Sequence, residues 1–334
     1  MTRKNIILFA FAIAIHYTVI AQDAQFSQFN LMPQFLNPAM TGFHSGVVRA
    51  GIVYRNHWSN VGGSEATFHT GGLNFDLSLL KNKLRTDYLG IGFSAIYDKN
   101  GINVFETTGG SFNIAYSKGF GDKLNQSIAL GFGTEFQFKN FQRDRAKFSD
   151  GIKENLGLTN SLFDMNIGIR YHCYVLDKAH VYFGFAYNHL LQAKDQRSPN
   201  SSSRLDAKYV AHAGSEIKLN DKWGLEPTAL FMYQKNTWQL NFGIMGQVAI
   251  GNNYDHFSYF AIGLSTRVNQ TVVDAVIPKA KVDFKGFNLN LAYDINVSGL
   301  KTASKSFGAI EVGASCVLSK DKKLRGHRSP NPNF

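Results

Sequence analysis

The side chains of this 334-residue chain that could do chemistry are its 10 histidines and 2 cysteines. No two of them have the helical or Cys-Xaa-Xaa-Cys spacing of a zinc site, and the adjacent His172 and Cys173 would point to opposite faces of a strand. Neither a Gly-Xaa-Ser-Xaa-Gly nucleophile elbow nor a phosphate-binding loop is present. The sequence therefore predicts no catalytic residue, no metal site and no cofactor, which leaves binding or transport as the function.

The elements that carry these residues are long alternating runs between residues 47 and 318. In the run 126–139, the alternate positions are Ile128, Leu130, Phe132, Thr134, Phe136 and Phe138. Because successive side chains of a strand point to opposite faces, such a run forms a ribbon with one apolar face. Strands in globular proteins usually have about 5 to 6 residues, whereas a tilted strand needs about 9 to 11 residues to cross a bilayer.

These runs predict an all-β fold, a transmembrane antiparallel β-barrel of about 14 strands, because lipid tolerates no open sheet edge. The predicted strands are residues 47–56, 67–80, 88–99, 104–118, 126–139, 162–175, 180–191, 207–219, 223–235, 237–250, 257–268, 271–284, 287–297 and 307–318. Pro278 lacks a backbone donor and is expected at an edge, a bulge or a rim. With both termini in the periplasm, the long connections 140–161 and 192–206 fall on the outer side.

The phase of the alternation assigns each residue to one side of the wall. Phe132 is expected to face lipid, and serine at the inward neighbour Gly131 is expected to matter much less for insertion than arginine at Phe132. Cys173 and Cys316 fall in the apolar phase of the sixth and fourteenth strands. They are therefore predicted to be free thiols that face lipid, too far apart around a barrel to form a disulfide.

The N-terminus predicts export. Arg3 and Lys4 precede an apolar run at residues 6–15, and Ala21 ends a signal-peptidase pattern, so residues 1–21 are expected to be a signal peptide. No other stretch approaches the roughly 18 apolar residues of a spanning helix. An exported chain of long alternating strands belongs in a bacterial outer membrane. The formal net charge of +11 favours anionic lipid or an acidic protein partner, and no nucleic-acid recognition module is visible.

Two segments lie outside the predicted barrel at 47–318. Residues 22–46 are rich in phenylalanine and interrupted by proline, so they are expected to form an N-terminal plug or a periplasmic segment. Residues 319–334 are predicted to be a basic periplasmic tail. Its positive residues are Lys320, Lys322, Lys323, Arg325 and Arg328. Both segments are expected to emerge on the periplasmic side.

Several short signatures stand apart from the alternation. They are residues 22–29 (QDAQFSQF), 36–42 (LNPAMTG), 54–58 (YRNHW), 293–298 (YDINVS), 300–301 (LK) and 308–312 (GAIEV), with further matches at 164–171, 187–190 and 223–227. In this order and spacing the chain resembles the PorP/SprF family of the type IX secretion and gliding apparatus over essentially all of its mature length. His57 stands where many members carry glutamine, and the tail is longer and more basic than is usual.

The resemblance implies a non-enzymatic outer-membrane barrel that works as a partner platform. Members of the family are associated with periplasmic lipoproteins and peptidoglycan-binding components of the secretion machine, or with export and surface attachment of a large gliding adhesin. The strands do not decide between these two roles. Besides these partners, the barrel is expected to contact outer-membrane lipid.

A partner-binding surface is predicted from the two unpatterned segments and the end of the first strand. Phenylalanines of the N-terminal segment are expected to act as apolar anchors, while basic residues of the tail steer an acidic partner. The predicted residues are Phe26, Phe29, Phe35, Asn37, Pro38, Arg55, Trp58, Lys320, Lys322, Lys323 and Arg325.

The alternative function is a diffusion channel for small or hydrophobic solutes. The polar inward residues that could line its pore are Arg49, Arg55, Asn74, Asp76, Glu135 and Arg170. Several other inward positions are small, namely Ala129, Gly131 and Gly133, and these do not define a path for a solute. Single-channel conductance separates the two functions, because a stable open pore favours the channel.

Overall fold

A computed structural model describes residues 23–58, 67–80, 87–100, 105–121, 125–141, 159–175, 178–194, 204–250, 258–270, 272–299 and 301–318. The predicted signal peptide at 1–21 and the predicted tail at 319–334 lie outside these residues. So do 142–158 and 195–203, which make up most of the two long connections.

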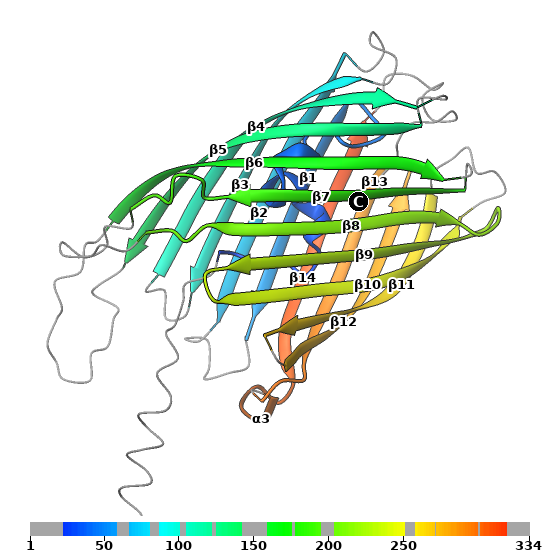
Figure 1. The fold of residues 1–334 in the computed structure, drawn as a ribbon. Helices are drawn as coiled ribbons and strands as arrows, with labels where there is room; N and C mark the ends of the chain where they lie inside the picture. Colours follow the sequence, from blue (N-terminus) through cyan, green and yellow to red (C-terminus); the bar gives the residue numbers. More distant parts are fainter. Residues whose placement is uncertain are drawn as a thin grey trace, which may run out of the picture.

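The described residues form fourteen strands that close into one antiparallel barrel, as the sequence predicted (Figure 1). The strands are β1 (Val48–His57), β2 (Phe68–Leu79), β3 (Tyr88–Asn100), β4 (Phe105–Phe120), β5 (Gln126–Phe141), β6 (Thr159–Val175), β7 (Ala179–Asn188), β8 (Lys208–Lys218), β9 (Trp223–Gln234), β10 (Thr237–Ala249), β11 (Ser258–Asn269), β12 (Val272–Phe284), β13 (Phe287–Asn296) and β14 (Phe307–Leu318). Each strand pairs with the next, and β1 pairs with β14 from Val48↔Leu318 to His57↔Ala309. The barrel therefore has no free sheet edge, as lipid requires.

The two ends of the barrel differ. β1 begins and β14 ends at one end, which we call the short-turn end. The connections from β5 to β6 and from β7 to β8 lie at the other end, which we call the long-loop end. Both long connections therefore share one end, as expected from the strand count.

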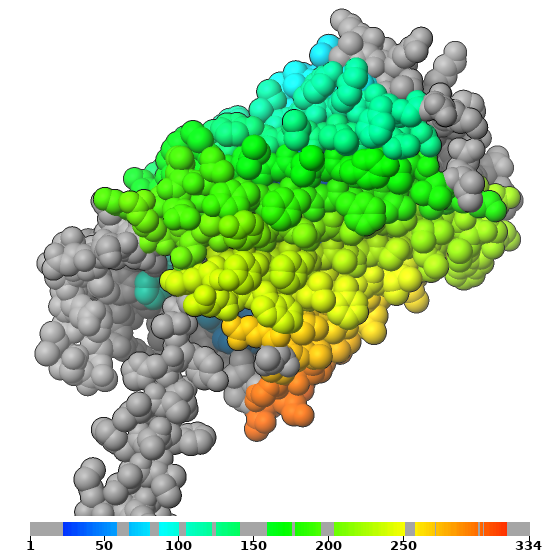
Figure 2. Space-filling model, viewed as in Figure 1, coloured from blue at the N-terminus to red at the C-terminus, as the bar shows by residue number. Residues whose placement is uncertain are grey.

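The alternation separates an apolar outer face from a polar or small inner face. On β5, Leu130 is 62% exposed and Phe132 is 41% exposed, whereas Ala129 and Gly131 between them are buried. The side chains of the neighbouring strands form a continuous outer surface in the space-filling view (Figure 2). Cys173 and Cys316 are free thiols and are half-buried. The predicted phase of the wall is thus confirmed on β5.

Pro278 lies in the middle of β12, which is neither an edge nor a rim. The pairing of β12 with β13 runs from Val276↔Ile295 to Lys279↔Ala292 and skips Pro278 and its neighbour Ile277. On the other side of β12, a register shift in β11 falls between Arg267 and Val268. The missing donor of proline is thus accommodated by a local gap in the ladder.

Residues 23–46, which we call the plug, lie inside the barrel (blue in Figure 1). They form three short turns: η1 (Phe29–Leu31), α2 (Pro33–Leu36) and η2 (Pro38–Met40). Pro33 and Pro38 each stand at the start of a turn, where a missing N–H costs nothing and the fixed φ suits the helix. Asn37 caps η2 by accepting a hydrogen bond from the backbone N–H of Ala39 at 2.8 Å.

The remaining helix, α3 (Lys301–Ser304), belongs to the connection between β13 and β14. No helix in the described part of the chain is long and apolar enough to cross a membrane.

Candidate functional site

Glycines on the inner wall receive the backbone of the plug. A Cβ added to Gly131 on β5 would lie 2.2 Å from the backbone nitrogen of Ala39, and one added to Gly90 on β3 would lie 2.2 Å from the carbonyl oxygen of Thr41. Both distances are far shorter than ordinary contacts, so no larger residue fits while the plug is in place. These inward glycines, which define no solute path, are therefore sockets for the plug.

The expectation that serine at Gly131 matters much less for insertion than arginine at Phe132 stays a prediction, but it concerns the barrel wall and not the plug. Because the plug backbone fills the space in front of Gly131, any side chain at this position must displace η2. The alternation of β5 does not reveal this tertiary packing.

The N-terminal part of the plug is fastened to the wall through Ser27, near the long-loop end of β1 and β13. Both Glu311 carboxylate oxygens accept backbone hydrogen bonds, from Ser27 N–H at 2.8 Å and from Gln28 N–H at 2.7 Å. The Ser27 hydroxyl donates to Asp294 Oδ1 at 2.7 Å. Arg55 donates from Nη2 to Asp294 at 2.7 Å and from Nη1 to Glu311 at 3.2 Å, and Nη1 also contacts the Ser27 hydroxyl. This cluster, which we call the latch, is buried.

Two further cations complete the latch. Arg267 on β11 places Nη2 at 2.8 Å from Asp294 Oδ2 and Nε at 2.7 Å from Asp274 Oδ2. Lys279 on β12 donates to the carbonyl oxygen of Ser27 at 3.0 Å. Charged groups buried in this way need every partner, since removing one partner of a buried pair typically costs about 3 to 5 kcal/mol.

The other end of the plug is held at the short-turn end by Arg49 and Asp76. Arg49 binds the Asp76 carboxylate in a fork, from Nε at 2.9 Å and from Nη2 at 2.8 Å. The same carboxylate accepts the backbone N–H of Gly42 at 2.6 Å, and Arg49 donates to the carbonyl of Phe43 at 3.3 Å. Gly42 has φ +76, a conformation that favours glycine. This group is the foot of the plug.

Arg170 on β6 binds the same region of the plug from another part of the wall. Its guanidinium carbon lies 3.7 Å from the centroid of the Phe43 ring, a cation–π geometry. It also donates to the hydroxyls of Tyr88 at 3.1 Å and Ser117 at 3.2 Å. Charged residues that could line a pore therefore hold the plug or support its contacts.

The N-terminal end of the plug lies at the long-loop end. Asp23 accepts hydrogen bonds from Lys208, at the start of β8, and pairs with His189, just after β7, both at 3.0 Å. Burial would raise the pKa of the Asp23 carboxyl, but the charges of Lys208 and His189 hold it well below its usual range. Burial would lower the pKa of His189, but the Asp23 carboxylate raises it above its ordinary value. We call this group the clamp.

The clamp corrects the expectation that residues 22–45 emerge wholly on the periplasmic side. The clamp lies at the long-loop end, whereas β1 begins at the short-turn end, so the plug runs through the lumen from one end to the other. The reason is that the plug is threaded through the barrel, which strand counting cannot show.

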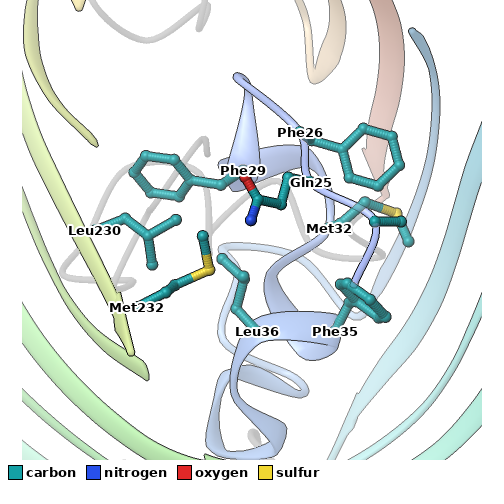
Figure 3. Close-up of a pocket in the computed structure, with 9 residues that line it drawn as sticks. Gln25, Phe26, Phe29, Met32, Phe35, Leu36, Leu230 and Met232 are labelled. Atoms are coloured by element: carbon teal, nitrogen blue, oxygen red, sulfur yellow. The ribbon is translucent and has the colours of Figure 1, made fainter. Parts of the chain in front are cut away.

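Apolar contacts fill the space between the turns of the plug and the wall. Figure 3 shows Phe29 and Leu36 facing Leu230 and Met232 of β9, with Phe26, Met32 and Phe35 on the other side of the plug. Only about one water-sized space remains among these side chains. The plug and wall are therefore close to fully packed here.

The structure brings most of the predicted partner-binding residues together as plug and wall. Phe26 and Phe29 are 7% and 4% exposed, Asn37, Pro38 and Arg55 are buried, and Phe35 is half-buried. Trp58 follows β1, half-buried, with its ring centroid 5.4 Å from that of Phe68 in an edge-on contact. Lys320, Lys322, Lys323 and Arg325 lie outside the described residues. The partner-binding role itself stays a prediction.

Apart from Arg55, the acids and bases of the latch and the clamp were not singled out from the sequence. Asp294, Glu311 and Arg267 are charged residues at inward positions of strands, and this pattern is the signal that could have found them. Glu135, which the sequence suggested as a pore residue, instead accepts hydrogen bonds from Gln137 at 2.7 Å and from Asn166 at 3.1 Å.

Comparisons with known proteins agree with this architecture. Residues 18–314 match a family model described as "Type IX secretion system membrane protein PorP/SprF". No curated protein matches the sequence. Among solved structures the barrel is similar to a "TodX deltaS2S3 mutant monoaromatic hydrocarbon channel", with a TM-score of 0.54 and 10% identity over 84% of this chain and 92% of that one. It is also similar to a Pseudomonas aeruginosa FadL homologue, with a TM-score of 0.46 and 10% identity over 86% and 94% of the two chains. At 10% identity the likeness to the TodX mutant channel shows only the fold.

Proposed function

We propose, because this chain belongs to the PorP/SprF family of type IX secretion system membrane proteins, that its outer-membrane barrel works as a non-enzymatic platform for partners of that system. It serves either export and surface attachment of a large adhesin or anchoring of periplasmic lipoproteins and peptidoglycan-binding components. The observation that carries the proposal is the plug, which lies in the lumen and is bonded to the wall toward both of its ends, by the clamp and the latch at one and by the foot at the other.

A plug fastened at the foot, the latch and the clamp suits a platform better than a channel. A solute that crosses the lumen at the latch, or between the plug and β9, must displace buried ion pairs or close-packed side chains. A platform needs only a rigid frame that presents its connections and termini to partners. The alternative, a diffusion channel for small or hydrophobic solutes, gains no support from the pore residues suggested for it, because Arg49, Asp76 and Arg170 bind the plug or its neighbours.

Docking surfaces for this platform lie at both ends of the barrel. In outer-membrane barrels the longer loops are extracellular and the short turns periplasmic, so the long-loop end with the clamp faces outward. The basic residues of the tail, Lys320, Lys322, Lys323 and Arg325, follow β14 at the periplasmic end and steer an acidic partner there. Phe26 and Phe29 are buried between the plug and the wall, so they do not form part of an exposed docking surface.

Co-purification from native membranes tests the platform. The full chain is compared with a variant that lacks residues 320–334, and recovery of type IX components is measured at low and high salt. The truncated barrel should insert normally and show heat-modifiable migration, while partner recovery falls most at low salt, where the charges of the tail are least screened. Recovery of no type IX component with either chain, together with a stable conductance of the purified protein, would favour the channel instead.

The direction of the plug is tested by labelling intact cells. Ala24→Cys is placed next to the clamp and Ser45→Cys near the foot, both in a chain whose own two cysteines are replaced by serine. A membrane-impermeant maleimide should label the Ala24→Cys variant from outside and leave the Ser45→Cys variant unlabelled. The reverse labelling would mean that the barrel is inserted the other way round.

A further inference from the structure

Two like charges are held side by side in the connection between β7 and β8. Lys194 and Arg204 form an isolated antiparallel bridge, and both side chains are exposed. Residues that face each other in this way have Cβ atoms about 4.5 to 5.5 Å apart, and like charges in that position destabilise the pair. Among the described residues neither cation has an acidic partner, although Arg204 donates to the carbonyl of Gln192 at 3.2 Å. The bridge therefore keeps an electrostatic cost that an anion would relieve.

This connection lies over the mouth of the barrel rather than against lipid. The backbone N–H groups of Leu191 and Ala193 donate to the carboxylate of Asp164, at 2.9 Å and 3.2 Å. Asp164 is an inward, buried residue of β6, so these bonds bend the connection toward the lumen. Leu205 on the returning arm is buried and donates to the carbonyl of Ala193 at 2.9 Å.

A third cation stands beside the bridge. Lys235, in the turn between β9 and β10, places Nζ at 3.3 Å from Asp206 Oδ2, and both side chains are more than a third exposed. Lys208 lies nearby in sequence but is already paired with Asp23 in the clamp. The described surface of this part of the mouth thus carries three cations, Lys194, Arg204 and Lys235, and the single acid Asp206.

We propose that Lys194, Arg204 and Lys235, which we call the mouth patch, bind an acidic segment of a polypeptide presented at the cell surface. The proposal rests on the platform function and names the chemistry of its outward partner. Carboxylates fit because the guanidinium fork of arginine binds them with two parallel hydrogen bonds. A peptide fits better than the phosphates of a membrane lipid, because the connection bends over the lumen and away from the lipid-facing side. The alternative that the experiment must exclude is that these three cations are ordinary solvated surface charges that bind no ligand.

Binding of a defined acidic peptide tests the mouth patch. The full chain is placed in lipid nanodiscs, and fluorescence anisotropy follows a labelled peptide of alternating Glu and Gly, with a Gln and Gly peptide as the neutral comparison. The test variant is Lys194→Gln with Arg204→Gln. The matched control is Lys218→Gln with Lys222→Gln, which removes the same charge from exposed positions at the opposite end. The test variant should weaken the Glu peptide about tenfold, the worth of one charge-assisted hydrogen bond, and the control less than about twofold.

Several outcomes would overturn the proposal. Equal losses in both variants would mean that the peptide senses only net charge, and equal binding of the Gln peptide would remove carboxylate recognition. Displacement of the Glu peptide by lipopolysaccharide, but not by free glutamate-rich peptide, would assign the patch to lipid. A variant that exchanges the two cations, Lys194→Arg with Arg204→Lys, keeps both charges and should bind the Glu peptide. Binding by this variant would show that the loss in the Gln variant comes from the missing charges and not from misfolding. Failure of the Glu peptide to bind the unmodified chain, while type IX components are still recovered with that chain, would refute the mouth patch and leave the platform standing.

Discussion

Replacing Gly131 by alanine should release the plug without harming the barrel. The added Cβ would lie 2.2 Å from the nitrogen of Ala39, 2.3 Å from the carbonyl carbon of Pro38 and 2.5 Å from Cα of Ala39. All three are backbone atoms, so no side-chain rotation relieves the overlap. Ordinary contact begins at 3.4 Å, so η2 must retreat from β5 by about 1.2 Å.

The size of the effect follows from overpacking. Forcing one methyl group into a filled site costs typically about 1 to 3 kcal/mol. At about 1.4 kcal/mol for each factor of ten, the population with a displaced plug should rise about 5- to 150-fold. The strand itself gains from alanine, because glycine in a strand carries an entropic cost. The destabilisation therefore acts on the packing of the plug against β5 and not on the strand itself.

Planar-bilayer recording and thermal unfolding together measure this prediction. The matched control is Gly133→Ala, two residues further along the same inward face of β5. There the added Cβ would meet Asn113 Oδ1 at 2.4 Å, the end of a side chain that can turn away, and none of its three nearest atoms belongs to the plug. The Gly131 variant should open more often than the control while both barrels keep heat-modifiable migration. Equal opening frequencies in the two variants would refute the assignment of Gly131 as a plug socket.

Three further predictions concern the wall, the latch and the clamp. Phe132→Arg, on the lipid face, should lower the unfolding free energy in lipid vesicles by about 2 to 4 kcal/mol if the residue lies near the midplane, and an unchanged value would place it at an interface. Asp294→Asn removes a buried carboxylate and should cost about 3 to 5 kcal/mol in thermal unfolding, whereas the surface change Asp206→Asn should cost less than about 1 kcal/mol. The raised pKa of His189 means that its contribution is complete below its ordinary value of 6.5 and is lost as pH rises through the raised pKa. Plug opening in bilayers should therefore increase as pH rises above 6.5, and His189→Asn should remove that increase. The lowered pKa of Asp23 means that its own contribution is complete above the ordinary value of 3.8 and is lost as pH falls through the lowered pKa, so a loss of the plug already near pH 5 would contradict the clamp.

The wall was predictable because its signal is local. The alternation of β5 reports which side chains face lipid residue by residue, and the observed strand, Gln126–Phe141, differs from the predicted 126–139 only at its far end. The end of β7 was placed three residues too late, since Tyr187, Asn188, His189 and Leu190 continue the pattern although His189 leaves the sheet with φ 61. Strand ends depend on turn geometry and the alternation does not encode it.

The contacts of the plug were not predictable from any local pattern. Ser27 and Glu311 are 284 positions apart, and they meet only because β1 pairs with β14 and the plug passes through the closed lumen. The proline-broken, phenylalanine-rich composition of 22–46 indicated a buried segment, but not its direction. Likewise the gap at Pro278 lies only in its pairing with β13, because the pairing with β11 runs through Leu264↔Pro278 without a break.

The sequence by itself determined the barrel, the number of its strands, the side of the wall on which each residue of β5 stands and the family resemblance, because a period of two and short signatures are properties of neighbouring residues. The tertiary structure alone decided that inward glycines are sockets, that inward charges fasten a plug, and that the N-terminal end of this plug lies at the long-loop end. The physical reason is that the lumen exists only once the sheet has closed, so every contact across it joins residues whose proximity no local pattern records.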